Sequence, residues 1–175
     1  MVTRRHGREW ALQMLVQFDL DAPDSPDRAI EAFWEQQAQL EAENLAEDRR
    51  EAKVIFTSTD PKVLEELATV RAFAEERVNG VWRERDAVDS MIEPFLENWS
   101  LYRLGTIERN VLRLGAWELT RSDIPSAIVI NESVDLAKFF SSTKAGRFVN
   151  GILDKFAKSV RSPKRQESPT ETFNP

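Results

Sequence analysis

Apolar residues recur along this chain at helical spacing, and no stretch shows the alternating pattern typical of a set of β-strands. Capping and helix-breaking residues divide the pattern into successive helices. We expect seven helices, over residues 3–19, 27–50, 61–79, 84–99, 106–121, 126–140 and 143–160. Short turns join them, so the pattern predicts an all-α bundle.

The helix expected over 106–121 has apolar residues on two neighbouring stripes. They are Ile107, Val111 and Leu114 on one stripe, and Leu112, Ala116 and Leu119 on the other. Such a wide apolar face is typical of a central helix that packs on more than one side.

We expect the bundle to divide near Gly80 into two small helical subdomains. Their predicted ranges are 1–80 and 81–161, and the first includes the basic start of the chain. The remaining residues, 162–175, are polar and rich in proline, which predicts a disordered tail.

Composition narrows the class of protein. The 175 residues are 41% apolar and include no cysteine, which excludes disulfides and thiolate metal sites. No run of about 18 apolar residues is present, and the basic N-terminus lacks the apolar run of a secretory signal. We therefore expect a soluble, cytoplasmic protein without a membrane partner.

The sequence offers little for catalysis. His6 is the only histidine, and neither a zinc-protease, a phosphate-loop nor a serine-hydrolase motif occurs. Acidic pairs such as Glu65-Glu66 lie on charge-rich helices, where solvated faces explain them. We expect neither an enzyme nor a resident metal or cofactor.

Charge is distributed unevenly along the chain, whose net charge is -6. Residues 21–100 hold 20 Asp/Glu against 9 Lys/Arg, whereas residues 143–165 hold 7 Lys/Arg against one Asp. Overall acidity therefore does not argue against a polyanionic partner, because positive charge gathers toward the two ends.

The first helix opens on arginines, although cations are disfavoured at the positive end of a helix dipole. Its buried stripe of Ala11, Met14, Leu15 and Phe18 extends backwards onto Arg4 and Arg8. We expect these first turns, with Arg5, to project past the body and to bind anions. A solvated helix terminus is the alternative interpretation.

A second basic cluster lies in the stretch TKAGRFVNGILDKFAKSVR. Lys144 and Arg147 occupy a different side of this helix from its apolar stripe. Gly146 and Gly151 each cost a helix interior about 1 kcal/mol, which indicates a neighbouring helix or a ligand close to the backbone. Asn150 between them is a candidate either for a capping contact or for a contact with a base.

Several stretches resemble the NusB family of transcription antitermination factors. They are RRHGREWALQMLVQFD, IERNVLRLGAWEL, DIPSAIVINESVDLAKFF and TKAGRFVNGILDK, in the order found in the family. The resemblance implies an all-helical NusB-like fold and a binding protein without catalysis. It also implies partners: the NusE ribosomal protein, single-stranded boxA RNA of ribosomal RNA transcripts, and the antitermination complex of RNA polymerase.

The resemblance also implies site residues. Arg4, Arg5 and Arg8 match the arginine-rich RNA-contacting start of the family, and Lys144 and Arg147 match basic residues before its FVNG motif. Asn150 belongs to that motif. Glu108 and Val16 match positions at the partner surface.

The chain departs from the family at three places. Val16 stands where the family often has tyrosine, Trp10 stands where a smaller residue is common, and residues 21–80 are long and acidic. We expect Trp10 to be buried in a second interface, with a stacking surface as the alternative.

Three alternatives remain open at this stage. A protein-interaction adapter without RNA binding is the main rival, and a NusB-like domain of a ribosomal RNA methyltransferase is another. Trp34, Trp82 and Trp99 serve either the core or a surface for self-association, which some family members show.

Overall fold

The structure is a computed structural model that describes residues 1–46, 54–97 and 99–161. In those ranges it contains α-helices and two short 3-10 helices and no β-strand, so the predicted all-α fold is confirmed. The helices are α1 (Arg4–Leu20), α2 (Pro26–Ala46), α3 (Pro61–Arg83), α4 (Arg85–Ile92), η1 (Glu93–Phe95), η2 (Leu101–Arg103), α5 (Thr106–Arg121), α6 (Ser126–Phe140) and α7 (Thr143–Arg161).

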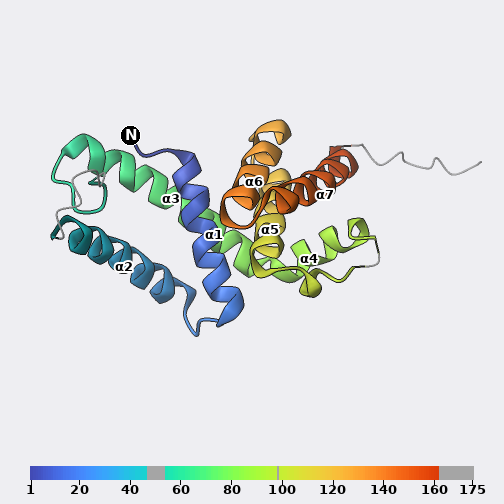
Figure 1. Cartoon of the computed structure of the whole chain (residues 1–175), viewed down its shortest axis with the longest axis horizontal. Helices are drawn as coiled ribbons and strands as arrows, with labels where there is room; N and C mark the ends of the chain where they lie inside the picture. Colours follow the sequence, from blue (N-terminus) through green and yellow to red (C-terminus); the bar gives the residue numbers. More distant parts are fainter. Residues whose placement is uncertain (47–53, 98, 162–175) are drawn as a thin grey trace, which may run out of the picture.

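Helix α5 lies at the centre of the bundle, as its wide apolar face predicts. It packs against α1, α3, α4, α6 and α7, and α6 and α7 cross it side by side (Figure 1). The residues of α5 from Asn110 to Glu118 are all buried. The helices that carry the two basic clusters, α1 and α7, therefore both pack against α5.

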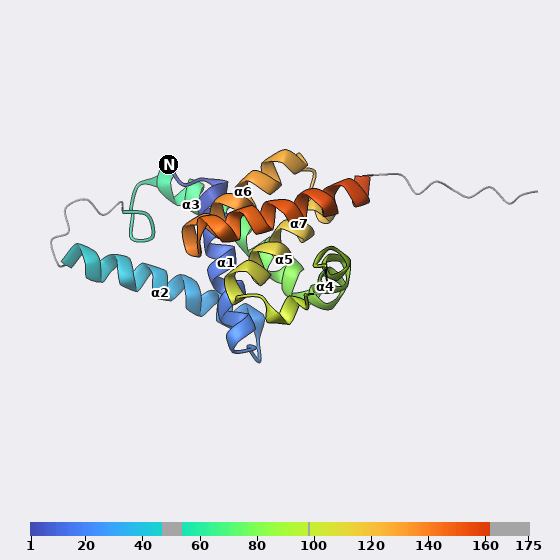
Figure 2. The ribbon, with the colours of Figure 1, turned by 45° about the vertical axis from the view of Figure 1, so that its right-hand side comes forward.

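Helix α2 lies on the side of α1 opposite to α7 in both ribbon views (Figure 2). Aromatic side chains join it to the body. The Trp10 ring lies 5.4 Å from that of Trp34 in an edge-on contact and 5.3 Å from that of Phe56. The prediction that Trp10 is buried in a second interface is confirmed, since only 7% of the residue is exposed.

Helix α3 extends beyond its predicted end at residue 79. It continues through Gly80 to Arg83, and Glu84 caps it. A Cβ atom on Gly80 would lie 2.2 Å from the indole of Trp117, so this glycine makes room for a buried ring. The predicted subdomain boundary therefore falls within a continuous helix, and the division itself stays a prediction.

The helix expected over 84–99 is shorter in the structure. α4 ends at Ile92, and the next turn is the 3-10 helix η1. Pro94 lacks the amide hydrogen that an α-helix needs there. Glu97 then adopts a positive φ of 43°, which does not continue a helix.

Other expected boundaries match the structure. The Asp60 side chain accepts a hydrogen bond of 2.9 Å from the Lys62 amide and so caps α3, with Pro61 in the first turn. The last residues of the helix expected over 27–50, and the tail expected to be disordered at 162–175, lie outside the described residues. Among the helices that are described, none combines the length and apolar character needed to cross a bilayer.

Candidate nucleic-acid interface

Arg8 lies in the interior, so the expectation that it projects past the body is wrong. Its Nε donates to Glu118 Oε2 at 2.9 Å and its Nη2 donates to Oε1 at 3.2 Å. The two side chains are 4% and 1% exposed. Because Glu118 supplies a buried countercharge, the buried face of α1 includes Arg8 as well as its apolar residues. Arg8 is a packing residue, and with 4% of its side chain exposed it offers little surface to an RNA phosphate.

Arg77 of α3 shares the same carboxylate. Its Nε donates to Glu118 Oε1 at 2.6 Å, and its guanidinium lies 3.2 Å from the centroid of the Phe73 ring. Burial lowers the pKa of Arg77, although Glu118 opposes that shift. Glu118 therefore ties α1 and α3 to the central helix α5.

Arg4 and Arg5 are exposed, as the anion-binding interpretation requires. Arg5 Nη1 lies 3.3 Å from Asp135 of α6, and its Nε lies 3.5 Å from Glu9. The Arg4 guanidinium lies 5.5 Å from the centroid of Phe73, and no carboxylate in the described ranges forms an ion pair with it. These two side chains are available to an anion from solvent.

The only histidine of the chain shapes this helix start. The Thr3 amide donates to Nδ1 of His6 at 3.1 Å. The ring thereby satisfies a backbone donor that α1 itself leaves without a partner. His6 is thus a capping residue of α1.

A hollow of about 730 Å³ opens beside Arg4 and Arg5, and we call it the N-terminal hollow. Its walls come from α1, from α3, and from the turn between α5 and α6. The lining residues include Arg4, Arg5, Arg8, Phe73, Arg77, Arg121, Ile128 and Glu132. The lining holds five arginines and three acidic residues, and an excess of one positive charge remains once the buried Glu118 behind Arg8 and Arg77 is counted, which favours an anionic ligand.

Lys144, Arg147 and Asn150 are exposed on α7. Two further hollows lie beside this helix, with volumes of about 480 and 310 Å³, and we call them the α7 hollows. Lys144 lines the larger and Arg147 lines the smaller, whereas Asn150 is in neither lining. The structure thus brings the two cations, but not the amide, to the same concave surface.

Trp99 and Phe148 line both α7 hollows. Trp99 is 61% exposed, so it serves neither as a core residue nor as a member of the aromatic cluster around Trp34. Trp82, in contrast, is partly buried against Phe18. An exposed aromatic ring between cations is the kind of surface on which nucleobases stack. In the sequence, Trp99 stands at the end of an expected helix, with its role open between the core and a surface, so no separate sequence signal indicates its place in these hollows.

Glu108 lies in the larger α7 hollow with Lys144. One of its carboxylate oxygens accepts a hydrogen bond of 2.5 Å from the hydroxyl of Ser141, which fixes the α6–α7 turn against α5. Val16 lies elsewhere, partly buried against the core on α1. The two expected partner residues therefore do not share one hollow.

The two glycines of α7 have different surroundings. A Cβ atom on Gly146 would lie 2.6 Å from the Lys138 side chain and 3.2 Å from the Val134 carbonyl oxygen, so α6 is the close neighbour there. A Cβ atom on Gly151 would meet no heavy atom within 4 Å. Gly151 instead faces the smaller α7 hollow.

A second buried charge cluster, which sequence reasoning missed, joins α1 to α4 and α5. Arg113 donates to both oxygens of Asp89 at 2.7 Å and to Asp19 at 2.8 Å, and Arg109 also pairs with Asp19. Partial burial raises the pKa of Asp19, but the bonds from Arg113 and Arg109 outweigh it and hold the pKa below its usual value. The described residues include no cluster of three or more side chains suited to a metal.

The amino-acid sequence matches the model of a known protein family. Residues 52–158 match the model of the NusB family, which is more than half of the chain. The chain belongs to the NusB family. The resemblance seen in the sequence is therefore confirmed, and the helical bundle is a NusB fold.

Relatives named as the transcription antitermination protein NusB match nearly the whole chain. The protein from Sorangium cellulosum is 37% identical over 161 residues, which cover 91% of this chain and 95% of the relative. The one from Myxococcus xanthus is 38% identical over 164 residues, covering 93% and 100%. This coverage is broader than that of the family model, which begins at residue 52.

Solved NusB structures share the fold. NusB of T. maritima superposes with a TM-score of 0.67 at 28% identity, covering 90% of this chain and 93% of that one. A crystal structure of the antitermination factors NusB and NusE in complex with dsRNA gives a TM-score of 0.65 at 28% identity. That match covers 89% of this chain and 96% of the solved chain.

Proposed function

We propose that this chain is a cytoplasmic transcription antitermination factor that binds boxA-type single-stranded RNA of ribosomal RNA transcripts. It binds the RNA as a heterodimer with the NusE ribosomal protein and acts within the antitermination complex of RNA polymerase. The protein has no catalytic role in this proposal, and it self-associates when NusE is absent.

The observation that carries the proposal is the pair of exposed basic clusters on an acidic protein. Arg4 and Arg5 border one positively lined hollow, and Lys144 and Arg147 border hollows that contain an exposed tryptophan. Cations bind the phosphates of any sequence, whereas aromatic and amide groups read single-stranded bases. The relatives' name supports a role in antitermination, and the solved complex of NusB and NusE with dsRNA supports RNA and NusE as partners.

The proposed roles follow from accessibility. Arg4, Arg5, Lys144 and Arg147 bind phosphates, and Asn150 contacts a base from the exposed side of α7. Glu108 and Val16 belong to the surface for NusE.

The test is the affinity for a short boxA-like RNA, measured by fluorescence anisotropy with and without NusE. An Arg4→Ala/Arg5→Ala variant is compared with Arg83→Ala/Arg85→Ala, whose arginines are 75% and 41% exposed and line none of the three hollows. We expect NusE to tighten binding and only the first variant to weaken it. Binding of NusE without any binding of RNA would instead identify a protein-interaction adapter.

A further inference from the structure

We propose that the exposed ring of Phe139, near the end of α6, stacks on a nucleobase of the bound RNA between the two basic clusters. The inference rests on the proposed function, because it adds a contact to the same RNA strand.

Phe139 presents an aromatic ring to solvent. The residue is 73% exposed, more than Trp99 or Tyr102. Its ring lies 4.9 Å from that of Phe140 at an interplanar angle of 80°, and Phe140 is partly buried against the core. The anchored neighbour supports one side of the Phe139 ring and leaves most of the residue accessible. A single exposed phenylalanine is common on protein surfaces, so the case for a functional role depends on where Phe139 lies.

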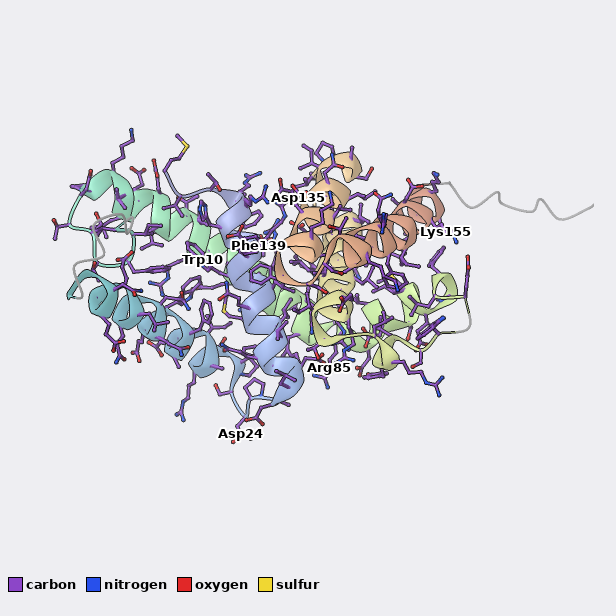
Figure 3. The ribbon with its side chains drawn as sticks, in the orientation of Figure 1. Trp10, Asp24, Arg85, Asp135, Phe139 and Lys155 are labelled. Atoms are coloured by element: carbon purple, nitrogen blue, oxygen red, sulfur yellow. The ribbon has the colours of Figure 1, made fainter. Side chains whose placement is uncertain are left out.

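Helix α6 connects the two basic regions, and Phe139 lies on its outward face. The helix starts beside the N-terminal hollow, which Ile128 lines, and ends just before α7. Ile128, Asp135 and Phe139 follow at spacings of seven and four, which places them on one face. Arg5 pairs with Asp135 at 3.3 Å, one turn before Phe139 (Figure 3).

The second basic region begins directly beyond the ring. Lys144 follows Phe139 by five residues, a stretch that spans at most about 18 Å. Lys138, which is 47% exposed and lies 3.8 Å from Asp135, adds a further cation to this part of α6. An RNA strand held by Arg5 at one end and Lys144 at the other therefore passes over the outward face of α6 and brings its bases to Phe139.

The acidic residues on this route lie near cations. Asp135 pairs with Arg5 and lies 3.8 Å from Lys138, and Glu132 lies 3.8 Å from Arg8. An RNA backbone on this face of α6 therefore meets neither Asp135 nor Glu132 without a nearby cation. When Arg5 exchanges Asp135 for a phosphate, which the exposure of this ion pair permits, Lys138 remains as the cation near Asp135.

Nucleic acid suits this surface better than a protein partner. A protein interface of standard size buries about 800 Å² on each side and centres on an apolar patch. Here a single exposed ring follows the charged Asp135 by one helical turn and the charged Lys138 by one residue. A base needs only the face of one ring together with cations for the adjoining phosphates.

The test compares Phe139→Ala, Phe139→Leu and Phe139→Tyr for binding of the boxA-like RNA. Stacking contributes about 1–3 kcal/mol per base, so we expect Phe139→Ala to weaken binding about fivefold to a hundredfold. Phe139→Tyr keeps the ring and retains affinity. Phe139→Leu keeps apolar area without the ring, and it weakens RNA binding nearly as much as alanine. Leu20→Ala is the matched control, because Leu20 is 72% exposed at the far end of α1.

Each outcome is decisive. RNA binding that depends on Arg4 and Arg5 but not on the Phe139 ring overturns this inference and leaves the proposed function intact. A loss that appears only with NusE and that leucine repairs makes Phe139 a protein contact, which also overturns it. Absence of RNA binding by the wild-type protein, with or without NusE, overturns the proposed function as well. Circular dichroism and thermal unfolding verify that each variant is folded.

Discussion

Arg8 and Glu118 lie 110 residues apart in the sequence and form a buried ion pair through two hydrogen bonds. The pair joins the first helix to the central one and fixes where Arg4 and Arg5 emerge. Since Arg77 binds the same carboxylate, one glutamate is shared by two buried guanidinium groups, and Arg77 also pairs with Glu76 at 3.1 Å.

Glu118→Ala should lower the free energy of unfolding by about 3–5 kcal/mol, because it leaves Arg8 and Arg77 buried without their countercharge. Arg8→Ala should cost less, since Arg77 still neutralises Glu118. Urea unfolding followed by circular dichroism measures both. Glu132→Ala is the control, because that side chain is 26% exposed and should change stability by less than about 1 kcal/mol. Equal effects of Glu118→Ala and Glu132→Ala would contradict this account.

Arg8 also shows what sequence periodicity could and could not give. The period of α1 correctly placed Arg8 on the same line as the buried Ala11 and Leu15. A basic residue on that line predicts either a helix end beyond the body or an interior position with a countercharge. The choice depends on Glu118, which only the tertiary fold brings within 3 Å.

The same limit applies to the site and to helix boundaries. Local signals were sufficient for the cap at Asp60 and for the exposure of Lys144 and Arg147. Gly80 was misread as a helix end, because its role depends on the distant Trp117. The hollow shared by Trp99 and Phe148 is also formed by residues far apart in sequence.

The salt dependence of RNA binding tests the revised set of phosphate contacts. Four accessible cations, Arg4, Arg5, Lys144 and Arg147, predict a slope of log K against log salt of about -3 for a single strand. Arg4→Ala/Arg5→Ala should reduce the slope to about -1.4. Arg8→Ala should leave it near the wild-type value under conditions where the protein is folded. A reduced slope for folded Arg8→Ala would show that RNA binding depends on the buried pair.

Asp19 should make stability depend on pH in the acid range. Its folded pKa lies below its usual value, because the bonds from Arg113 and Arg109 outweigh burial. The stabilisation is therefore complete above the unfolded pKa of about 3.9 and is lost as pH falls through the folded value. Asp19→Asn should cost about 2 kcal/mol at pH 7 and flatten the decline of unfolding free energy below pH 4. If the unfolding free energy of the two proteins declined equally steeply below pH 4, the titrating group would be a residue other than Asp19.

Two glycine substitutions should have opposite effects on stability, although both glycines lie in helices and no described glycine has a positive φ. Gly80→Ala puts a methyl group into the Trp117 ring and should lower the unfolding free energy by about 1–3 kcal/mol. Gly151→Ala meets no neighbour within 4 Å and should raise it by about 0.5–1 kcal/mol through helix propensity. Urea unfolding at low protein concentration compares the two with wild type. Destabilisation by Gly151→Ala that grows with protein concentration would show that a second copy covers the smaller α7 hollow, because a methyl group would then disturb that interface.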